Sequence, residues 1–152
     1  MRAAKLTPDK CCVIIPFRDR ADLLHKNLIA LLQDLPKKAL IVLIDDGSEA
    51  PLELNQKFKE LLSHSAVKLM SHDINLGPAA ARNTAINWCR ETDLELVILL
   101  DSDCVIRPGF VEKHIELHNR FPEFACIGGA IQGEGDTGAA RIDAIMSWFT
   151  SI

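Results

Sequence analysis

The chain has 152 residues, of which 48% are hydrophobic and 25% are charged, and its formal net charge is −4. This length predicts a single domain over residues 1–152, long enough to bury one sizeable core. The mild acidity argues against nucleic acid as a partner, and no apolar run approaches the roughly 20 residues of a transmembrane segment.

Continuous apolar runs recur along the chain at intervals that leave room for a helix between them. In chain order, the predicted strands cover residues 11–15, 39–45, 66–72, 94–101 and 125–131. The second and fourth runs are apolar on both faces, which is typical of central parallel strands covered by helices.

The segments between these runs show the spacing of apolar residues that favours helices. The predicted helices cover residues 20–33, 51–62, 77–91, 109–121 and 138–152, and Pro51 suits a first helical turn. Because strands and helices alternate, we expect an α/β fold, a doubly wound and mostly parallel sheet with helices on both faces. The Gly-rich acidic stretch 132–138 is expected to be a loop.

Polar or turn-forming residues follow four consecutive predicted strands. These are "PFRDR" at 16–20, "DDGS" at 45–48, "DINLGPAAARN" at 73–83 and "DSD" at 101–103. In open α/β sheets, ligands bind beyond the carboxyl ends of the strands, where the strand order reverses. One such stretch is weak evidence, since every strand must end, but the four together predict a ligand site at one edge of the sheet.

The "DSD" stretch places two carboxylates, Asp101 and Asp103, with one residue between them. In an extended chain, residues i and i+2 point the same way, so both carboxylates could approach one cation. Hard oxygen ligands of this kind favour Mg²⁺ or Mn²⁺. The alternative is a solvated acidic turn, because Asp and Ser are ordinary turn residues.

Two further strand ends carry candidate ligand-binding residues. In "DDGS", one of Asp45 and Asp46 could fix the turn and the other could accept a hydrogen bond from a ligand, and the alternative is a turn alone. Arg82 falls in the first two turns of the helix after Gly77-Pro78, where it could pair with a phosphate, and the alternative is a surface arginine.

The chain contains five cysteines, an odd number without the spacing of a metal site. They lie singly or as an adjacent pair in or beside apolar segments, and the N-terminus lacks the apolar stretch of a secretory signal. These features indicate reduced thiols in a cytoplasmic protein rather than a disulfide framework.

Taken in order, these motifs resemble the family 2 glycosyltransferases, enzymes of the GT-A fold. The resemblance runs from about residue 11 to about residue 133 and rests on four features. They are the apolar strand that ends at Pro16, the "DDGS" box, the N-x-G-x-x-x-A-R-N stretch from Asn75 to Asn83, and the D-x-D motif of Asp101 and Asp103. The resemblance implies transfer of a sugar from a nucleotide-diphospho-sugar donor to an acceptor hydroxyl.

The resemblance also implies roles for the residues that would bind the nucleoside. Pro16, Phe17 and Arg18 would border the base. Asp46 would accept a hydrogen bond from a base N–H, with Asp45 in support.

The remaining implied roles concern the diphosphate and a divalent cation. Arg82 would lie near the base and the diphosphate, and Asp101 would face the ribose and the waters of the metal. Asp103 would bind Mn²⁺ or Mg²⁺ directly. A UDP-sugar is the expected donor, and the acceptor, a saccharide or another hydroxyl compound, is unknown.

One departure from the family concerns the general base, which inverting members carry well downstream of D-x-D, usually in an acidic pair. Here the only later acids in the expected loop are Glu134 and Asp136, which are weak candidates because they resemble solvated loop residues. The chain therefore resembles the donor-binding half of an enzyme without the acceptor and base region. The alternative is a catalytically incomplete sugar-nucleotide-binding module.

The final segment 145–152 contains Trp148 and Phe149, and a homodimer contact is one way to cover it. Two other classes of protein fit less well. A phospho-acceptor signalling domain requires a lysine after the fifth strand, where this sequence reads "IQGEG". A dinucleotide-binding dehydrogenase requires G-x-G-x-x-G after the first strand, which is missing.

Overall fold

The computed structural model describes residues 5–129. The chain divides into two compact units, Met1–Arg120 and Phe121–Ile152, and the sheet and its helices belong to the first. That the chain acts as one domain therefore stays a prediction. The predicted helix 138–152, the loop 132–138 and the segment proposed for a dimer contact lie outside the described residues.

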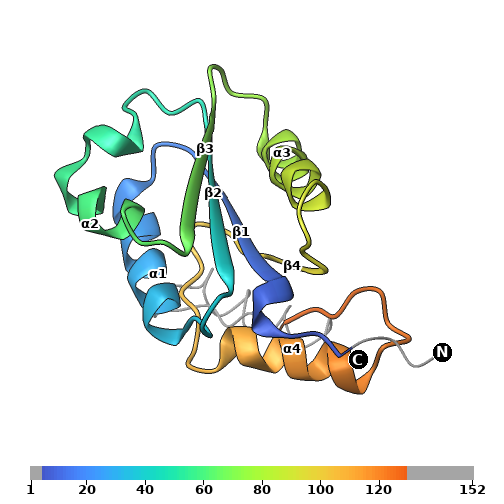
Figure 1. The fold of residues 1–152 in the computed structure, drawn as a ribbon. Coiled ribbons are helices and arrows are strands. Elements are labelled where there is room, and N and C mark those ends of the chain that lie inside the picture. The colour runs from blue at the N-terminus through green and yellow to red at the C-terminus, as the bar shows by residue number, and fades with distance from the viewer. Residues whose placement is uncertain (1–4, 130–152) are drawn as a thin grey trace, which may run out of the picture. The chain divides into compact units, whose positions relative to one another are not determined.

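The four described strands form one parallel sheet with the order β3-β2-β1-β4 (Figure 1). Their bounds are Cys11–Phe17 for β1, Leu40–Asp46 for β2, Val67–His72 for β3 and Leu96–Leu99 for β4. The chain runs from β1 outward to β3 and then returns to place β4 on the other side of β1. The strand order thus reverses between β1 and β4, as expected for a doubly wound sheet.

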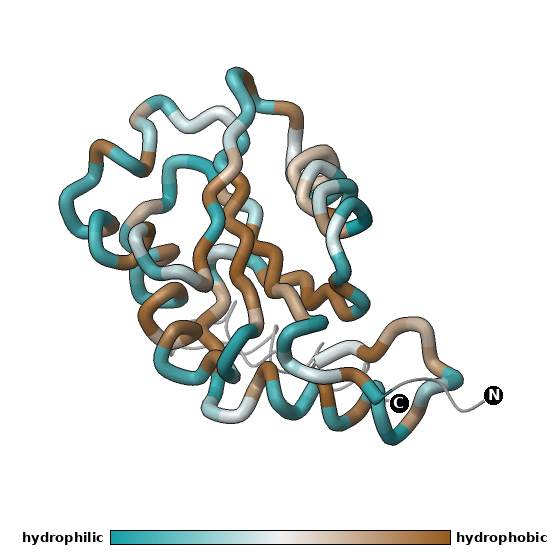
Figure 2. The backbone as a smooth tube through the Cα atoms, viewed as in Figure 1, coloured by the Kyte–Doolittle hydropathy of each residue, from teal (hydrophilic) through white to brown (hydrophobic). Residues whose placement is uncertain are grey.

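Helices cover both faces of this sheet, which confirms the predicted α/β fold (Figure 1). Helix α3 (Pro78–Arg90) packs Ala81, Ala85 and Cys89 against one face. Helices α1 (Ala21–Asp34) and α4 (Phe110–Arg120) contribute apolar side chains to the other face. β1 and β2 are buried along almost their whole length between these layers. Both strands are hydrophobic along most of their length (Figure 2), which is typical of parallel strands covered on both faces.

Residues 51–62 do not form the continuous helix that their apolar spacing predicts. They form two 3₁₀ turns, Leu52–Leu54 and Gln56–Phe58, followed by the short helix α2 (Lys59–Leu62). Asn55 interrupts the helix, because its backbone is extended and its side-chain oxygen accepts a hydrogen bond from the Lys57 N–H at 3.1 Å. Such local side-chain bonds compete with helix formation. A further 3₁₀ turn, Pro8–Lys10, precedes β1.

The fifth predicted strand is wrong for the residues that the structure describes. Residues 125–129 contain no strand, and 130–131 lie outside the described range. Gly128 and Gly129 fall in this run, and glycines weaken a strand because they lose more backbone entropy and add no side-chain packing. In the same unit, the rings of Phe121 and Phe124 pack with their centroids 6.2 Å apart.

All five cysteines have free thiols, and Cys11, Cys12 and Cys89 are buried. Burial raises the pKa of Cys11 to about 12, so this thiol is inert at neutral pH. In the part of the chain that the structure describes, no helix combines the length and the apolar character needed to cross a membrane.

Candidate functional site

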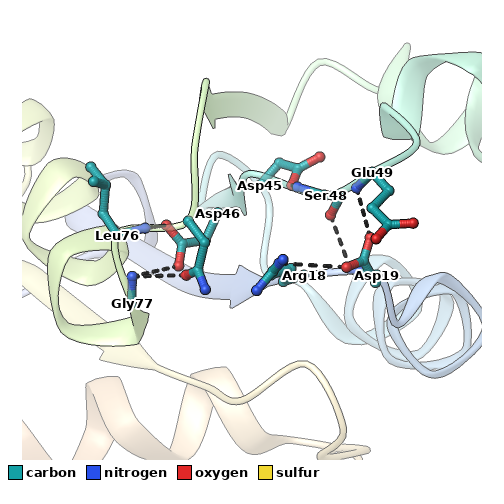
Figure 3. A network of polar contacts seen from close by, with 9 residues as sticks. Arg18, Asp19, Asp45, Asp46, Ser48, Glu49, Leu76 and Gly77 are labelled. Atoms are coloured by element: carbon teal, nitrogen blue, oxygen red, sulfur yellow. Dashed lines mark hydrogen bonds and ion pairs between the residues drawn. The ribbon is translucent and has the colours of Figure 1, made fainter.

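The end of β2 is joined to the loop after β3 through the carboxylate of Asp46 (Figure 3). Its Oδ1 accepts hydrogen bonds from the Leu76 N–H at 3.0 Å and from His72 Nδ1 at 2.8 Å, and its Oδ2 accepts one from the Gly77 N–H at 2.8 Å. Asp46 is only 5% exposed. One buried carboxylate thus holds the loop that leads into α3.

These hydrogen bonds determine the charge of Asp46. Burial by itself raises the pKa of the carboxyl group, but the hydrogen bonds from Leu76, His72 and Gly77 together outweigh it, so the pKa lies below its usual value. Asp46 is therefore ionised at neutral pH. Three of the roughly four acceptor positions of its carboxylate are occupied, which leaves one position on Oδ2.

The loops after β1 and β2 are joined by reciprocal hydrogen bonds (Figure 3). The Asp19 N–H donates to Ser48 Oγ at 2.9 Å, and the Glu49 N–H donates to Asp19 Oδ1 at 2.8 Å. Asp45 closes its own turn by accepting from the Ser48 N–H at 2.8 Å. Asp19 adopts a φ of 56°, a left-handed conformation that Asp tolerates better than most residues.

Gly47 of the "DDGS" box packs closely against the backbone of the loop after β3. It has a φ of +71°, and a Cβ added there would lie 2.5 Å from both Asn75 N and Ile74 C. Both atoms belong to the backbone, so they cannot move away as a flexible side chain would. Glycine is therefore needed here for conformation and for close approach.

We expect Gly47→Ala to destabilise the protein by about 3 kcal/mol, because it combines a strained φ with a backbone clash. Gly109→Ala is the matched control, since Gly109 has a φ of +79° with no atom within 4 Å of an added Cβ. Gly109→Ala should lose only about 1 kcal/mol of stability, because it has the strained φ without the backbone clash. Chemical denaturation of both variants measures the difference, and equal losses would contradict the close approach at Gly47.

The D-x-D carboxylates come together through a turn and not through an extended strand, so the geometric reason given above was wrong. β4 ends at Leu99, and the Cys104 N–H donates to the Asp101 carbonyl at 3.1 Å. The turn gathers one ligand atom each from Asp101, Asp103 and Cys104 within 4.8 Å of one another.

Two arginines, one on α3 and one just before α1, pair with these carboxylates. Arg82 on α3 donates from Nη2 to Asp101 Oδ1 at 2.5 Å, and its side chain is 29% exposed. Arg20, just before α1, lies with Nη1 3.4 Å from Asp103 Oδ2. These pairs link the loop after β4 to α3 and to the loop after β1. All four predicted strand ends are thus connected at one edge of the sheet.

The first predicted stretch, residues 16–20, lies at this edge, and its first two residues expose little side-chain surface. Pro16 and Phe17 end β1 and are buried, and Phe17 is part of the core that faces α1 and α4. Arg18 is half-exposed, with Nε 3.5 Å from Asp19 Oδ2. A ligand here would meet the backbone of Pro16 and Phe17 and the side chain of Arg18.

The sequence model of glycosyl transferase family 2 matches residues 12–150, which is most of the chain. The chain belongs to this family. Among its curated relatives is the pre-mycofactocin glycosyltransferase of Mycobacterium tuberculosis, which is 32% identical over 137 residues. Glycosyltransferase GlyA of Streptococcus pneumoniae serotype 4 is 32% identical over 108 residues. These matches cover 89% and 70% of this chain but only 27% and 15% of the two relatives.

Solved structures with a similar fold support the α/β assignment of this family 2 chain. A mannosyltransferase from Pyrobaculum calidifontis, solved with GDP-Man and Mn²⁺, aligns with a TM-score of 0.58 over 74% of this chain and 32% of its own. TarS of S. aureus (residues 1–349), solved with UDP, aligns with a TM-score of 0.61 over 82% of this chain and 40% of its own. Both are 21% identical to it.

The donor atoms of the family 2 chain fit a hard divalent cation. Asp101 and Asp103 offer carboxylate oxygens on half-exposed side chains, which leaves room for waters and for oxygens of a bound molecule. Burial and the neighbouring carboxylates of Asp103 and Asp101 raise the pKa of Cys104. Its thiol therefore stays protonated at neutral pH and is a poor ligand for Mg²⁺ or Mn²⁺.

Asn27 of α1 contacts the D-x-D turn from the core, and no sequence pattern singles it out. It is fully buried, and its Nδ2 donates to the Asp101 carbonyl at 3.2 Å. Its Oδ1 is the one buried side-chain polar atom without a hydrogen-bond partner among the residues described. The buried amide of Asn27 thus supports the turn that carries both carboxylates, although its unpaired oxygen lowers the stability of the fold.

We expect Asn27→Leu to raise the free energy of unfolding by about 1 kcal/mol, because it removes a buried unpaired oxygen, and the Asp101 carbonyl keeps the Cys104 N–H as donor. If Asp101 and Asp103 hold a cation, the same substitution should weaken the binding of Mn²⁺ there, because the turn loses its support. Denaturation and calorimetry on the same variant test this trade-off. Loss of stability with unchanged metal-dependent binding would contradict it.

Several residues at this edge received no role from the sequence, namely Asp19, Arg20, Asn27, Ser48, His72 and Cys104. Arg20 had the clearest signal, since it is charged and stands between a strand end and a helix. Glu134 and Asp136 lie outside the described residues, so their candidacy as general base stays a prediction.

Proposed function

We propose that this chain is the donor-binding half of a metal-dependent, inverting glycosyltransferase that transfers a sugar from a UDP-sugar to an acceptor hydroxyl. One observation carries the proposal. Asp101 and Asp103 lie at the carboxyl edge of the sheet with Arg82 and Arg20 paired to them. This edge adjoins the point between β1 and β4 where the strand order reverses, which is where doubly wound sheets bind nucleotides.

In this proposal, Asp103 would hold Mn²⁺ or Mg²⁺ directly, and Asp101 would hold the waters of the metal and the ribose. When bound, the cation would supply Lewis-acid stabilisation of the charge on the departing nucleoside diphosphate. Arg82 would exchange its contact with Asp101 for a contact with a phosphate oxygen, because guanidinium groups match phosphate geometry well.

The nucleoside part of the donor is assigned to the other side of the same edge. Asp46 keeps one acceptor position on Oδ2, which suits a single N–H of the base. Asp45 supports it by closing the turn at Ser48. Arg18 and the backbone of Pro16 and Phe17 would border the base.

The proposed donor also draws on the proteins that share the fold. One was solved with GDP-Man and Mn²⁺ and another with UDP, so nucleotide diphosphates are the ligand class to test. The inverting outcome rests on the resemblance to the family. The cytoplasm is the proposed location, because five free thiols suit a reducing compartment.

A second candidate is a binding module without turnover. It rests on the general base, for which the sequence offers only the weak candidates Glu134 and Asp136. The chain spans about 27% of the length of the curated relatives that match it over most of its sequence.

Calorimetric titration with UDP-, GDP- and TDP-sugars, each with and without Mn²⁺, tests the proposal. We expect the UDP-sugar to bind most tightly and Mn²⁺ to increase its affinity. Absence of binding by all three donors would reject the proposed function. Release of free sugar from the donor, measured with Mn²⁺, separates an active transferase from a module that only binds.

A further inference from the structure

We propose that His72 is a positioning residue of the nucleotide site, which holds Asp46 with one ring nitrogen and α3 with the other. Nδ1 lies 2.8 Å from Asp46 Oδ1, and Nε2 lies 2.9 Å from Thr84 Oγ1. The side chain of His72 is only 10% exposed. This inference rests on the proposed function, because it assigns Asp46 and Arg82 to the nucleotide.

The direction of both hydrogen bonds follows from Asp46. An ionised carboxylate only accepts hydrogen bonds, and Asp46 is ionised because its pKa lies below the usual value. Nδ1 of His72 therefore carries a proton in every charge state of the ring. In the neutral ring, Nε2 has no proton and accepts the hydroxyl proton of Thr84. In the neutral ring, both hydrogen bonds therefore have a defined direction, which leaves the buried ring one orientation.

The ring joins three elements that carry the site. His72 ends β3, Asp46 ends β2 and Thr84 lies in α3. Asp46 also accepts from the Gly77 N–H at the start of α3. Asp46 thus holds the start of α3 directly, through the Gly77 N–H. It also holds α3 about two turns later, through the His72 ring and the hydroxyl of Thr84.

This attachment has a consequence for Arg82, which lies two residues before Thr84 in the same helix. Its guanidinium reaches Asp101 at the end of β4, on the far side of β1 and β2 from β3. The position of α3 on the sheet therefore sets how far Arg82 extends toward the diphosphate. His72 would couple the residue that reads the base to the residue that contacts the phosphates.

Thr84 gives the sharpest test, because its hydroxyl contacts His72 and its effect on a nucleotide must pass through the ring. Thr84→Val removes the hydroxyl and keeps the shape, and Thr84→Ser keeps the hydroxyl. We expect Thr84→Val to bind UDP with Mn²⁺ about 3- to 10-fold more weakly, which corresponds to one hydrogen bond. Thr84→Ser should bind like the wild type, and uridine, which has no phosphates, should lose less affinity than UDP.

Ring-nitrogen NMR of His72 gives a second readout that does not depend on a nucleotide. We expect a protonated Nδ1 in the wild type throughout the pH range of the folded protein, and altered Nε2 resonances in Thr84→Val. A neutral ring protonated at Nε2 would overturn the inference.

The outcomes separate this inference from the function on which it rests. If the wild type binds UDP and Thr84→Val binds it equally well, the positioning role is rejected and the donor site stands. If thermal stability falls in both Thr84 variants while UDP affinity stays unchanged, the network is only structural and the inference fails. If the wild type binds no nucleotide, both are rejected.

Discussion

Asp103→Ala should abolish the gain in UDP affinity that Mn²⁺ provides. The loss should be at least the roughly 10- to 100-fold that removing an outer partner of a metal ligand costs, because Asp103 is assigned as a direct ligand. Without metal, UDP should bind the variant slightly better than the wild type. The reason is that one negative charge beside the diphosphate is gone and Arg20, its partner at 3.4 Å, is released.

Calorimetry with and without Mn²⁺ measures both effects. Glu116→Ala is the matched control, since Glu116 is an exposed carboxylate on α4 that pairs with Lys113 at 2.9 Å. The control should retain the full metal effect. A metal-dependent gain of the same size in Asp103→Ala would place the cation elsewhere.

Asp46→Ala should destabilise the protein by about 3 kcal/mol, because it leaves the N–H groups of Leu76 and Gly77 and the Nδ1 of His72 without their acceptor. At about 2–4 °C per kcal/mol for a chain of this size, the midpoint of thermal unfolding should fall by about 10 °C. On the proposed function, UDP and uridine should both bind more weakly, with or without metal, because the base would lose its proposed acceptor and the loop before α3 would lose its hydrogen bonds to Asp46.

The matched control for this substitution is Asp45→Asn. Asp45 accepts one hydrogen bond, from the Ser48 N–H, and the amide oxygen of Asn can accept it as well. This variant should unfold close to the wild-type temperature. If the unfolding midpoints of Asp46→Ala and Asp45→Asn differ by less than a few degrees, the hydrogen bonds to Asp46 do not hold the loop before α3, and this prediction is wrong.

The ionisation of Asp46 also predicts a pH dependence. Its pKa in the folded protein lies below that in the unfolded chain, which is about 3.9. Its contribution to stability is therefore fully present above about pH 3.9 and is lost as the pH falls through the lower folded value. The difference in stability between the wild type and Asp46→Ala should shrink over this range.

Much of the fold could be predicted because the interior strands are apolar on both faces. The second run, in β2, is buried between helices as predicted, whereas the fourth run gives β4, which lies at the edge of the described sheet and leaves Leu99 51% exposed. The helical spacing of α1, α3 and α4 agreed with a sheet covered on both faces. The run at 51–62 has helical spacing too, but Asn55 closes a local hydrogen bond that competes with the helix. The spacing of apolar residues does not reveal a local hydrogen bond that competes with the helix.

The strand ends could be predicted as one polar edge, because parallel strands deliver their carboxyl ends to the same side. The contacts that organise this edge could not be predicted, since they join residues far apart in the sequence. Asn27 reaches the carbonyl of Asp101, 74 positions away. His72 contacts partners 26 and 12 positions away. A histidine and an asparagine carry no sign of such partners until the fold brings them together.

The central claim is that the four strand-end loops form one site for a nucleoside diphosphate and its cation. Mapping amide chemical-shift changes of the ¹⁵N-labelled chain on addition of UDP and Mg²⁺ tests it most directly. We expect the changes to concentrate in residues 16–20, 45–48, 74–82 and 101–104 together. Changes confined to 101–104, with the amides of Asp46 and Gly77 unaffected, would contradict it.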